Sequence, residues 1–139
     1  MADILIAIKP KYANLILNRK KKVEVRRRGS SIQPGDRLVI YSSSPEKKVV
    51  GTCEVRDVIV ETPVELFRRL GSGTCLTKGE FETYLEGTSR GVGIGVKRVR
   101  RFAKPIGLST LRQELGGFSV PQSYRFLLGN EVKAIVPWS

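Results

Sequence analysis

The spacing of apolar positions predicts short strands and helices that alternate from the start of the chain. Ile4 to Ile8 is a continuous apolar run, typical of a buried strand. Apolar residues then recur at helical spacing after Pro10, which suits the first turn of a helix. From Lys21 the period changes to two, because Val23 and Val25 alternate with polar side chains, as in a half-buried strand. We therefore expect a strand, a helix and a second strand.

Further strand-like segments occupy the middle of the chain. Residues 37–42 and 48–61 are rich in strand-forming residues, and Gly51 indicates a bulge or bend of the kind with which barrels turn corners. Residues 91–96 read Gly-Val-Gly-Ile-Gly-Val, which fits neither the dinucleotide-binding fingerprint nor the Walker fingerprint. Their strict alternation predicts a core strand with a bare glycine face, open to another backbone or to a flat ligand.

Short helices are predicted between these strands. Thr62 is the expected N-cap of one helix, and Thr77 forms a capping box with Glu80 in the next. A third helix spans residues 109–115. No linker or repeat divides the chain, so residues 1–139 are predicted to form one domain. Strands separated by turns, with short helices inserted, indicate an α+β fold: a small β-barrel of about five to six strands decorated by helices.

Charge adds a functional expectation to this picture. The chain carries 25 Lys or Arg residues against 13 Asp or Glu residues, a net charge of +12. Such a balance favours a polyanionic partner, and nucleic acid ahead of a membrane, since no basic amphipathic helix with a bulky apolar face stands out. A generally basic, solvated surface is the alternative explanation. One basic segment runs from Lys9 to Arg28, with Glu24 as its single acid. The other contains Lys97, Arg98, Arg100, Arg101 and Lys104.

Composition also excludes several kinds of site. The chain has no histidine, which excludes Ser-His-Asp and Cys-His catalysis and His-based zinc sites. Cys53 and Cys75 are too few for a disulfide framework and lack metal-ligand spacing. We therefore expect no metal and no other cofactor. The absence of a long apolar run and of a signal-peptide start predicts a soluble cytoplasmic protein without a membrane partner, monomeric by default.

The segment KPKYANLIL followed by KKVEVRRR resembles the opening of an ASCH domain, a PUA-like family named after the activating signal cointegrator homology region. Members read K-P-x-Y-A-x-x-I-L and then G-x-K-T-V-E-x-R; the family's glycine is Arg19 here and its threonine is Lys22. The later segment RRFAKPIGLSTLRQELGGFSVPQSYRFL resembles the family's ending. The resemblance covers residues 4–128 and leaves 129–139 as a C-terminal extension. It implies a PUA-like barrel with a cleft beside the first helix, where the Lys-Glu-Arg strand and the Pro-Gln-Ser segment should meet.

The first functional hypothesis is a nucleic-acid-binding domain with a basic cleft and a role in RNA metabolism or transcription regulation. RNA is the expected partner, with single-stranded DNA as the alternative. Cations from both basic segments would converge around Glu24 at a concave opening and neutralise phosphates. Polar and stacking groups would come from the Pro-Gln-Ser segment. The residues predicted to bind nucleic acid are Lys9, Lys21, Lys22, Glu24, Arg26, Arg28, Gln122, Ser123 and Tyr124, with Lys97, Arg98, Arg100 and Arg101 as a secondary patch.

The second hypothesis is a small hydrolase, and it rests on the resemblance. Some ASCH-like proteins are N4-acetylcytidine amidohydrolases with an active lysine, threonine and glutamate, and others have been described as ribonucleases. Lys21 matches the lysine, whereas Glu24 stands at the threonine position and Thr74 at the glutamate position. The carboxylate and the hydroxyl of the family's active residues are thus exchanged between these two positions, or lost. If the protein is an enzyme, Lys21 and Glu24 are the candidate catalytic residues. A third role, as a protein-interaction module of a transcriptional regulator, rests on the family alone.

Overall fold

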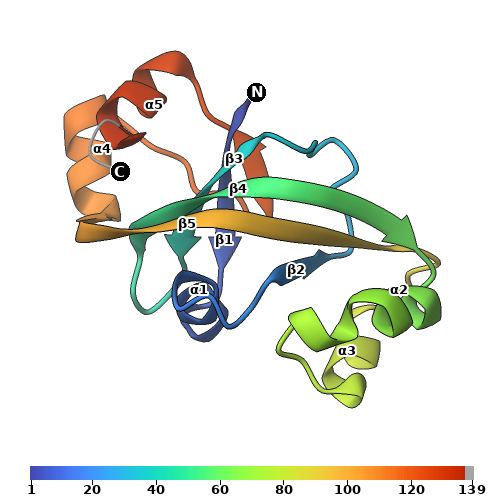
Figure 1. Ribbon diagram of the computed structural model, residues 1–139. Coiled ribbons are helices and arrows are strands. Elements are labelled where there is room, and N and C mark those ends of the chain that lie inside the picture. The colour runs from blue at the N-terminus through green and yellow to red at the C-terminus, as the bar shows by residue number, and fades with distance from the viewer. Residues whose placement is uncertain (137–139) are drawn as a thin grey trace.

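The computed structural model describes residues 1–136, which form one curled six-stranded sheet and five α-helices (Figure 1). The strands are β1 (Asp3–Ile8), β2 (Val23–Arg26), β3 (Arg37–Ser42), β4 (Lys48–Glu61), β5 (Gly91–Gly107) and β6 (Tyr124–Phe126). Their order in the sheet is β2-β5-β4-β3-β1-β6. β1 pairs with β3 in parallel and with β6 in antiparallel, and the remaining neighbours pair antiparallel. The sheet curls into a half-barrel, which confirms the predicted α+β barrel-like fold.

The helices gather in three places around this sheet. They are α1 (Pro10–Leu17), α2 (Pro63–Leu70), α3 (Lys78–Tyr84), α4 (Leu108–Leu115) and α5 (Gly129–Ile135), with a 3₁₀ turn at Gly71–Gly73. α2 and α3 lie together at one end of the long β4–β5 pair, and α4 and α5 lie at the other end (Figure 1). The predicted caps are present: Glu65 N–H donates to the Thr62 hydroxyl, and Thr77 and Glu80 form the capping box.

β5 is longer than the strand predicted at residues 91–96. It continues through the second basic segment to Gly107, because β4 offers a hydrogen-bonding partner along that length. Three register shifts interrupt the pairing, and Arg98 adopts a positive φ of 50°. These irregularities break the period of two that would have marked the strand in the sequence. The predicted irregularity at Gly51 is present, since the register also shifts between Val49 and Gly51.

The hydrophobic core of residues 1–136 consists of three clusters, two on the faces of the sheet and one at its end. One cluster packs under α1 and includes Ile4, Ile6 and Ile16, and a second packs under α4 and α5 and includes Leu111 and Ile135. A third cluster joins β2 to α2 and α3 through Val23, Val25, Leu66, Phe81 and Leu85. No helix within residues 1–136 is long and apolar enough to cross a membrane.

The bare glycine face of β5 receives helices rather than a ligand. A Cβ atom on Gly93 would lie 2.6 Å from Leu70 Cδ1, and one on Gly91 would lie 2.8 Å from Leu85 Cδ1. The glycines therefore let α2 and the segment after α3 approach the strand closely. At the other end of the chain, residues 129–135 of the predicted extension form α5 and pack onto the core, and residues 137–139 lie outside the described part.

Candidate nucleic-acid interface

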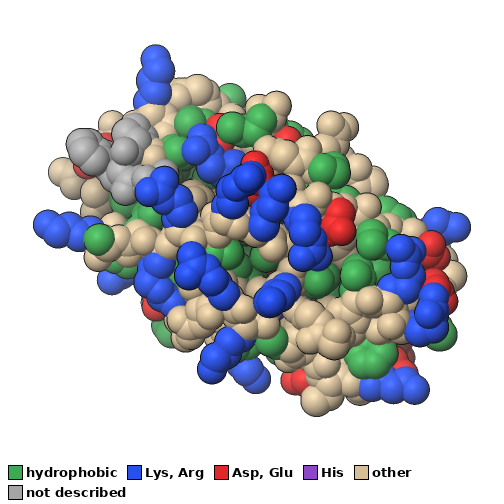
Figure 2. All heavy atoms as spheres, in the orientation of Figure 1, with side chains coloured by type: hydrophobic (Ala, Val, Ile, Leu, Met, Phe, Trp, Pro, Cys, Tyr) green, Lys and Arg blue, Asp and Glu red, His purple; other side chains and the backbone are tan. Residues whose placement is uncertain are grey.

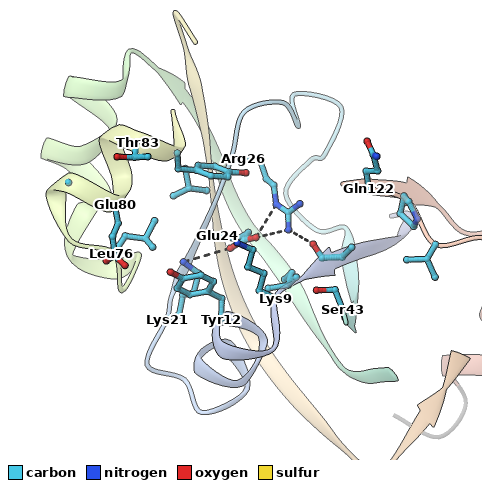
Figure 3. Close-up of a pocket in the computed structure, with 17 residues that line it drawn as sticks. Lys9, Tyr12, Lys21, Glu24, Arg26, Ser43, Leu76, Glu80, Thr83 and Gln122 are labelled. Carbon is cyan, nitrogen blue, oxygen red and sulfur yellow. Dashed lines mark hydrogen bonds and ion pairs between the residues drawn. The ribbon is translucent and has the colours of Figure 1, made fainter. Parts of the chain in front are cut away.

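A cavity of about 750 Å³ opens between α1, β2, α3 and the segment that precedes β6 (Figure 3). Because β1 leads directly into α1, the ends of both elements contribute to its wall. Side chains from five regions of the sequence line it. The polar and aromatic ones are Lys9, Tyr12, Lys21, Glu24, Arg26, Ser43, Glu80, Thr83, Tyr84 and Gln122, and the apolar ones include Ile8, Val25, Leu76, Val120 and Pro121.

Three charged side chains are buried together in the wall of this cavity. Lys21, Glu24 and Arg26 retain only 2%, 6% and 7% of their accessible surface. Arg26 donates to Glu24 Oε2 from Nε at 2.9 Å and from Nη2 at 2.7 Å. Lys21 Nζ lies 3.7 Å from Glu24 Oε1 (Figure 3). The group, which we call the charged triad, carries two positive charges and one negative charge when all three side chains are ionised.

Contacts from distant segments fix the triad in place. The Arg26 guanidinium also donates from Nη2 to the Ala7 carbonyl oxygen at 2.7 Å and from Nη1 to Ser123 Oγ at 3.3 Å. Lys21 Nζ donates to the Thr74 carbonyl oxygen and lies 5.2 Å from the centre of the Tyr12 ring. Four of the five N–H bonds of the Arg26 guanidinium are therefore engaged by protein partners. Lys21 Nζ and Glu24 Oε1 keep hydrogen-bonding capacity that a ligand can use.

Burial shifts the pKa of two groups in the cavity. Desolvation lowers the pKa of Lys21 below its ordinary value of 10.5, and the attraction of Glu24 offsets part of that change. Lys21 therefore releases its proton at a lower pH than an exposed lysine. Desolvation also raises the pKa of Tyr84, so its phenol stays protonated and can act as a hydrogen-bond donor.

The ASCH domain family model matches residues 6–105 of this chain. The chain belongs to the ASCH domain family. A relative from Zymomonas mobilis, named "ASCH domain-containing ribonuclease", is 28% identical over 134 residues, which cover 96% of this chain and 90% of that protein. The crystal structure of ASCH from Zymomonas mobilis has a TM-score of 0.91 and 27% sequence identity, and the match covers 98% of this chain and 94% of that one.

Two further comparisons are more distant. A Ureaplasma parvum protein named "Large ribosomal subunit protein uL22" is 24% identical over 124 residues, which cover 89% of this ASCH domain but only 39% of that protein. A hypothetical protein from Leishmania major has a TM-score of 0.63 at 16% identity, with 99% of this chain and 93% of that chain covered. The latter likeness shows the fold alone.

The structure brings part of the predicted binding set of this ASCH domain together. Lys9, Lys21, Glu24, Arg26 and Gln122 line the cavity, and Ser123 contacts Arg26. These residues come from both ends of the chain, and the pairing of β6 with β1 holds them side by side. The predicted meeting of the Lys-Glu-Arg strand with the Pro-Gln-Ser segment is therefore present in the structure.

Other predicted residues lie elsewhere. Lys22 and Arg28, which lie on either side of β2, are exposed and do not line the cavity. Tyr124 is half-buried, and its hydroxyl pairs with Ser31 at 2.7 Å rather than with the triad. The prediction of a half-buried β2 was wrong, since all four of its residues are buried.

The secondary patch does not converge on the cavity either. Lys97, Arg98, Arg100 and Arg101 are exposed on β5, and Figure 2 shows Lys and Arg side chains gathered along the band that this strand follows in Figure 1. Lys97 and Arg98 form ion pairs with Glu54 of β4. The predicted convergence of both basic segments around Glu24 was therefore wrong. Within residues 1–136, the cations that line the cavity all belong to the first segment, because β5 directs the others to a different surface.

Sequence reasoning missed the contribution of α3 and the turn before it. Tyr84, Thr83 and Leu76 line the cavity, although the sequence predicted only a capped helix in this region. Glu24 and Thr74, which stand at the family's threonine and glutamate positions, lie close together in the structure, since both contact Lys21. The Thr74 hydroxyl, however, donates to the Gly71 carbonyl oxygen at 2.7 Å, accepts from Leu76 N–H at 3.2 Å and is not part of the cavity wall.

Proposed function

We propose that this ASCH domain binds single-stranded RNA and takes one nucleobase into the cavity beside the charged triad. The observation that carries the proposal is the burial of Lys21, Glu24 and Arg26 in the wall of an open cavity of about 750 Å³. Burial of charged side chains carries a desolvation penalty, and apolar side chains at the same positions would stabilise the fold equally well. Their placement in a wall of ligand-binding size favours recognition of a polar ligand.

Each part of the cavity has a role in this proposal. Lys9 is exposed at the rim, where it can neutralise a phosphate. Lys21 Nζ and Glu24 Oε1 offer one donor and one acceptor to the polar edge of a base. Tyr12 and Tyr84 supply aromatic rings for stacking. Such contacts need an unpaired base, so a duplex is a poor ligand. The relatives named as a ribonuclease and as a ribosomal protein support RNA over DNA.

The proposal is tested by fluorescence anisotropy with single-stranded RNA, single-stranded DNA and duplex DNA of equal length across a salt series. We expect the tightest binding to single-stranded RNA and an affinity that falls as salt rises. Lys21→Ala and Lys9→Ala should weaken binding, whereas Lys133→Ala, an exposed change on α5, should not. Lys9→Ala changes no buried group and controls for misfolding of the Lys21 variant. Equal affinity for the duplex, or full affinity in both cavity variants, would reject the proposal.

RNA cleavage at the same site is the second candidate. The lowered pKa of Lys21 and the relative named as a ribonuclease favour it. A metal-independent cleavage transfers the 2′-hydroxyl proton to a base while that oxygen attacks the adjacent phosphorus. A 2′,3′-cyclic phosphate forms as the bond from phosphorus to the 5′-oxygen breaks, and the leaving 5′-oxygen takes a proton from water. Neutral Lys21 or the free oxygen of Glu24 can accept the first proton. Labelled RNA with one 2′-deoxy position should then be cut everywhere except at that position, and Lys21→Met should abolish cutting.

Deacetylation of N4-acetylcytidine is the remaining hydrolytic possibility. The Thr74 hydroxyl is engaged in its own loop and does not line the cavity, so it is not placed to act as a nucleophile there. Incubation with N4-acetylcytidine, followed by chromatography, should leave the nucleoside intact. Its consumption, and the loss of that activity in Glu24→Gln, would replace the binding proposal.

A further inference from the structure

A second, smaller cavity lies on the other side of α1 and has a volume of about 330 Å³. Pro10, Ala13, Asn14 and Leu17 of α1 form one wall, and the paired strands β4 and β5 form the other. Lys9 and Tyr12 of the same helix face the first cavity. α1 therefore separates the two cavities and contributes side chains to both. We call the second one the α1–β5 groove.

Hydrogen-bond donors dominate the polar lining of this groove. Arg101 of β5 donates from Nη2 to Asn14 Oδ1 at 3.1 Å and to Asn18 Oδ1 at 2.7 Å, which fixes the guanidinium against α1. Its Nε and Nη1 groups make no hydrogen bond or ion pair within residues 1–136. Lys48 of β4 also lines the groove and has no carboxylate partner in the described part of the chain. Glu46 is the single acid among the lining residues.

We infer that the α1–β5 groove binds a backbone phosphate of the same RNA strand whose base enters the first cavity. A fixed guanidinium with three free N–H bonds, one on Nε and two on Nη1, suits a phosphate, and the unpaired ammonium of Lys48 adds a second charge. Leu17, Val50 and Pro105 give the groove an apolar floor on which a sugar or base can pack. The inference rests on the proposed function, because it extends that binding site rather than defining a separate one.

The geometry of α1 explains how one strand can reach both cavities. A helix with its side chains is about 10–12 Å wide, a span that a few nucleotides can bridge. Between the cavities lies the N-terminus of α1, which has no side-chain cap and no acid in its first turn. The partial positive charge of this helix end favours a phosphate that passes over it. Lys9 stands at the same end of the helix.

The inference predicts an effect of RNA length, which anisotropy with a dinucleotide and with a ten-nucleotide RNA measures. Arg101→Gln and Lys48→Ala should leave dinucleotide affinity unchanged, weaken binding of the longer RNA about tenfold at low salt, and reduce its salt slope by about 0.7 for each lost phosphate contact. Glu46→Gln should strengthen binding of the longer RNA only. Arg90→Ala, an exposed arginine outside both cavities, is the matched control.

Each outcome decides between the two claims. If the groove variants behave like Arg90→Ala on both RNAs, or weaken the dinucleotide as much as the longer RNA, the groove inference fails while binding at the first cavity stands. If Lys9→Ala and Lys21→Ala have no effect on either RNA, the proposed function fails and the inference falls with it. Preserved melting temperature in every variant ensures that lost affinity reports a lost contact.

Discussion

Arg26 donates two hydrogen bonds to a single oxygen of Glu24, two residues earlier on the same strand. Neighbours at this spacing share one face of a strand, so β2 presents both side chains to the cavity. The pair leaves the other oxygen of Glu24 to Lys21. A four-residue strand and the lysine before it thereby hold three buried charged side chains, two positive and one negative, around one carboxylate.

Removal of the Glu24 charge should destabilise the fold strongly. In Glu24→Gln the buried Lys21 and Arg26 lose their shared counter-charge, and the unfolding free energy should fall by about 3–5 kcal/mol, as for other broken buried pairs. Chemical denaturation measures the change. Glu65→Gln, which breaks an exposed ion pair with Arg68, is the control and should have a much smaller effect. Equal losses in the two variants would show that burial of the triad is energetically irrelevant.

Stability should also depend on pH through Lys21. Because its pKa is lower in the folded protein than the ordinary 10.5, the unfolded chain binds more protons between those two pKa values. The free energy of unfolding therefore rises with pH in that interval. At lower pH, burial of the charged Lys21 side chain reduces the free energy of unfolding. Wild type should show a larger gain in unfolding free energy than Lys21→Met as the pH approaches 10.5. Parallel pH profiles of the two proteins would contradict the lowered pKa.

Tyr84 should contribute to RNA binding through its ring. It is 41% exposed at the cavity wall, and loss of a stacking ring weakens nucleic-acid binding by about 1–3 kcal/mol per base. Tyr84→Ala should therefore reduce RNA affinity about 5- to 150-fold, while Tyr84→Phe retains most of it. Phe126→Ala removes an exposed ring outside the cavity and should change nothing. An equal loss in Tyr84→Phe would assign the effect to the hydroxyl instead.

Substitution by alanine should have opposite effects on the stability of the fold at two glycines, Gly51 and Gly79. A Cβ on Gly51 would press on the Arg100 backbone carbonyl and lie 2.7 Å from Leu17 Cδ2, so Gly51→Ala should destabilise the fold by about 1–3 kcal/mol. Gly79, within α3, has open space around the same position. Gly79→Ala should stabilise by about 0.4–1 kcal/mol, because alanine restricts the unfolded chain. Thermal unfolding of both variants distinguishes the cases, and two shifts of the same sign would refute the steric argument.

Where the sequence predicted an element well, the signal was local. Thr77 and Glu80 indicate the start of a helix, because a capping box is formed by two residues only three positions apart. Alternation of Val23 with Val25 marks β2 for the same reason. The length of β5 was underestimated because its second half is basic and irregular, and its extent depends on a partner strand that local pattern does not reveal.

The sequence by itself determined the helix caps, the excess of positive charge and the placement of Lys21, Glu24 and Arg26 around one short strand. Only the tertiary structure decided that these charges are buried, that Ser123 reaches Arg26 across 97 positions, and that the β5 cations face another surface. The physical reason is the strand order. Pairing of β1 with β6 and of β2 with β5 is a long-range choice of hydrogen-bond partners, which no periodicity within a single segment encodes.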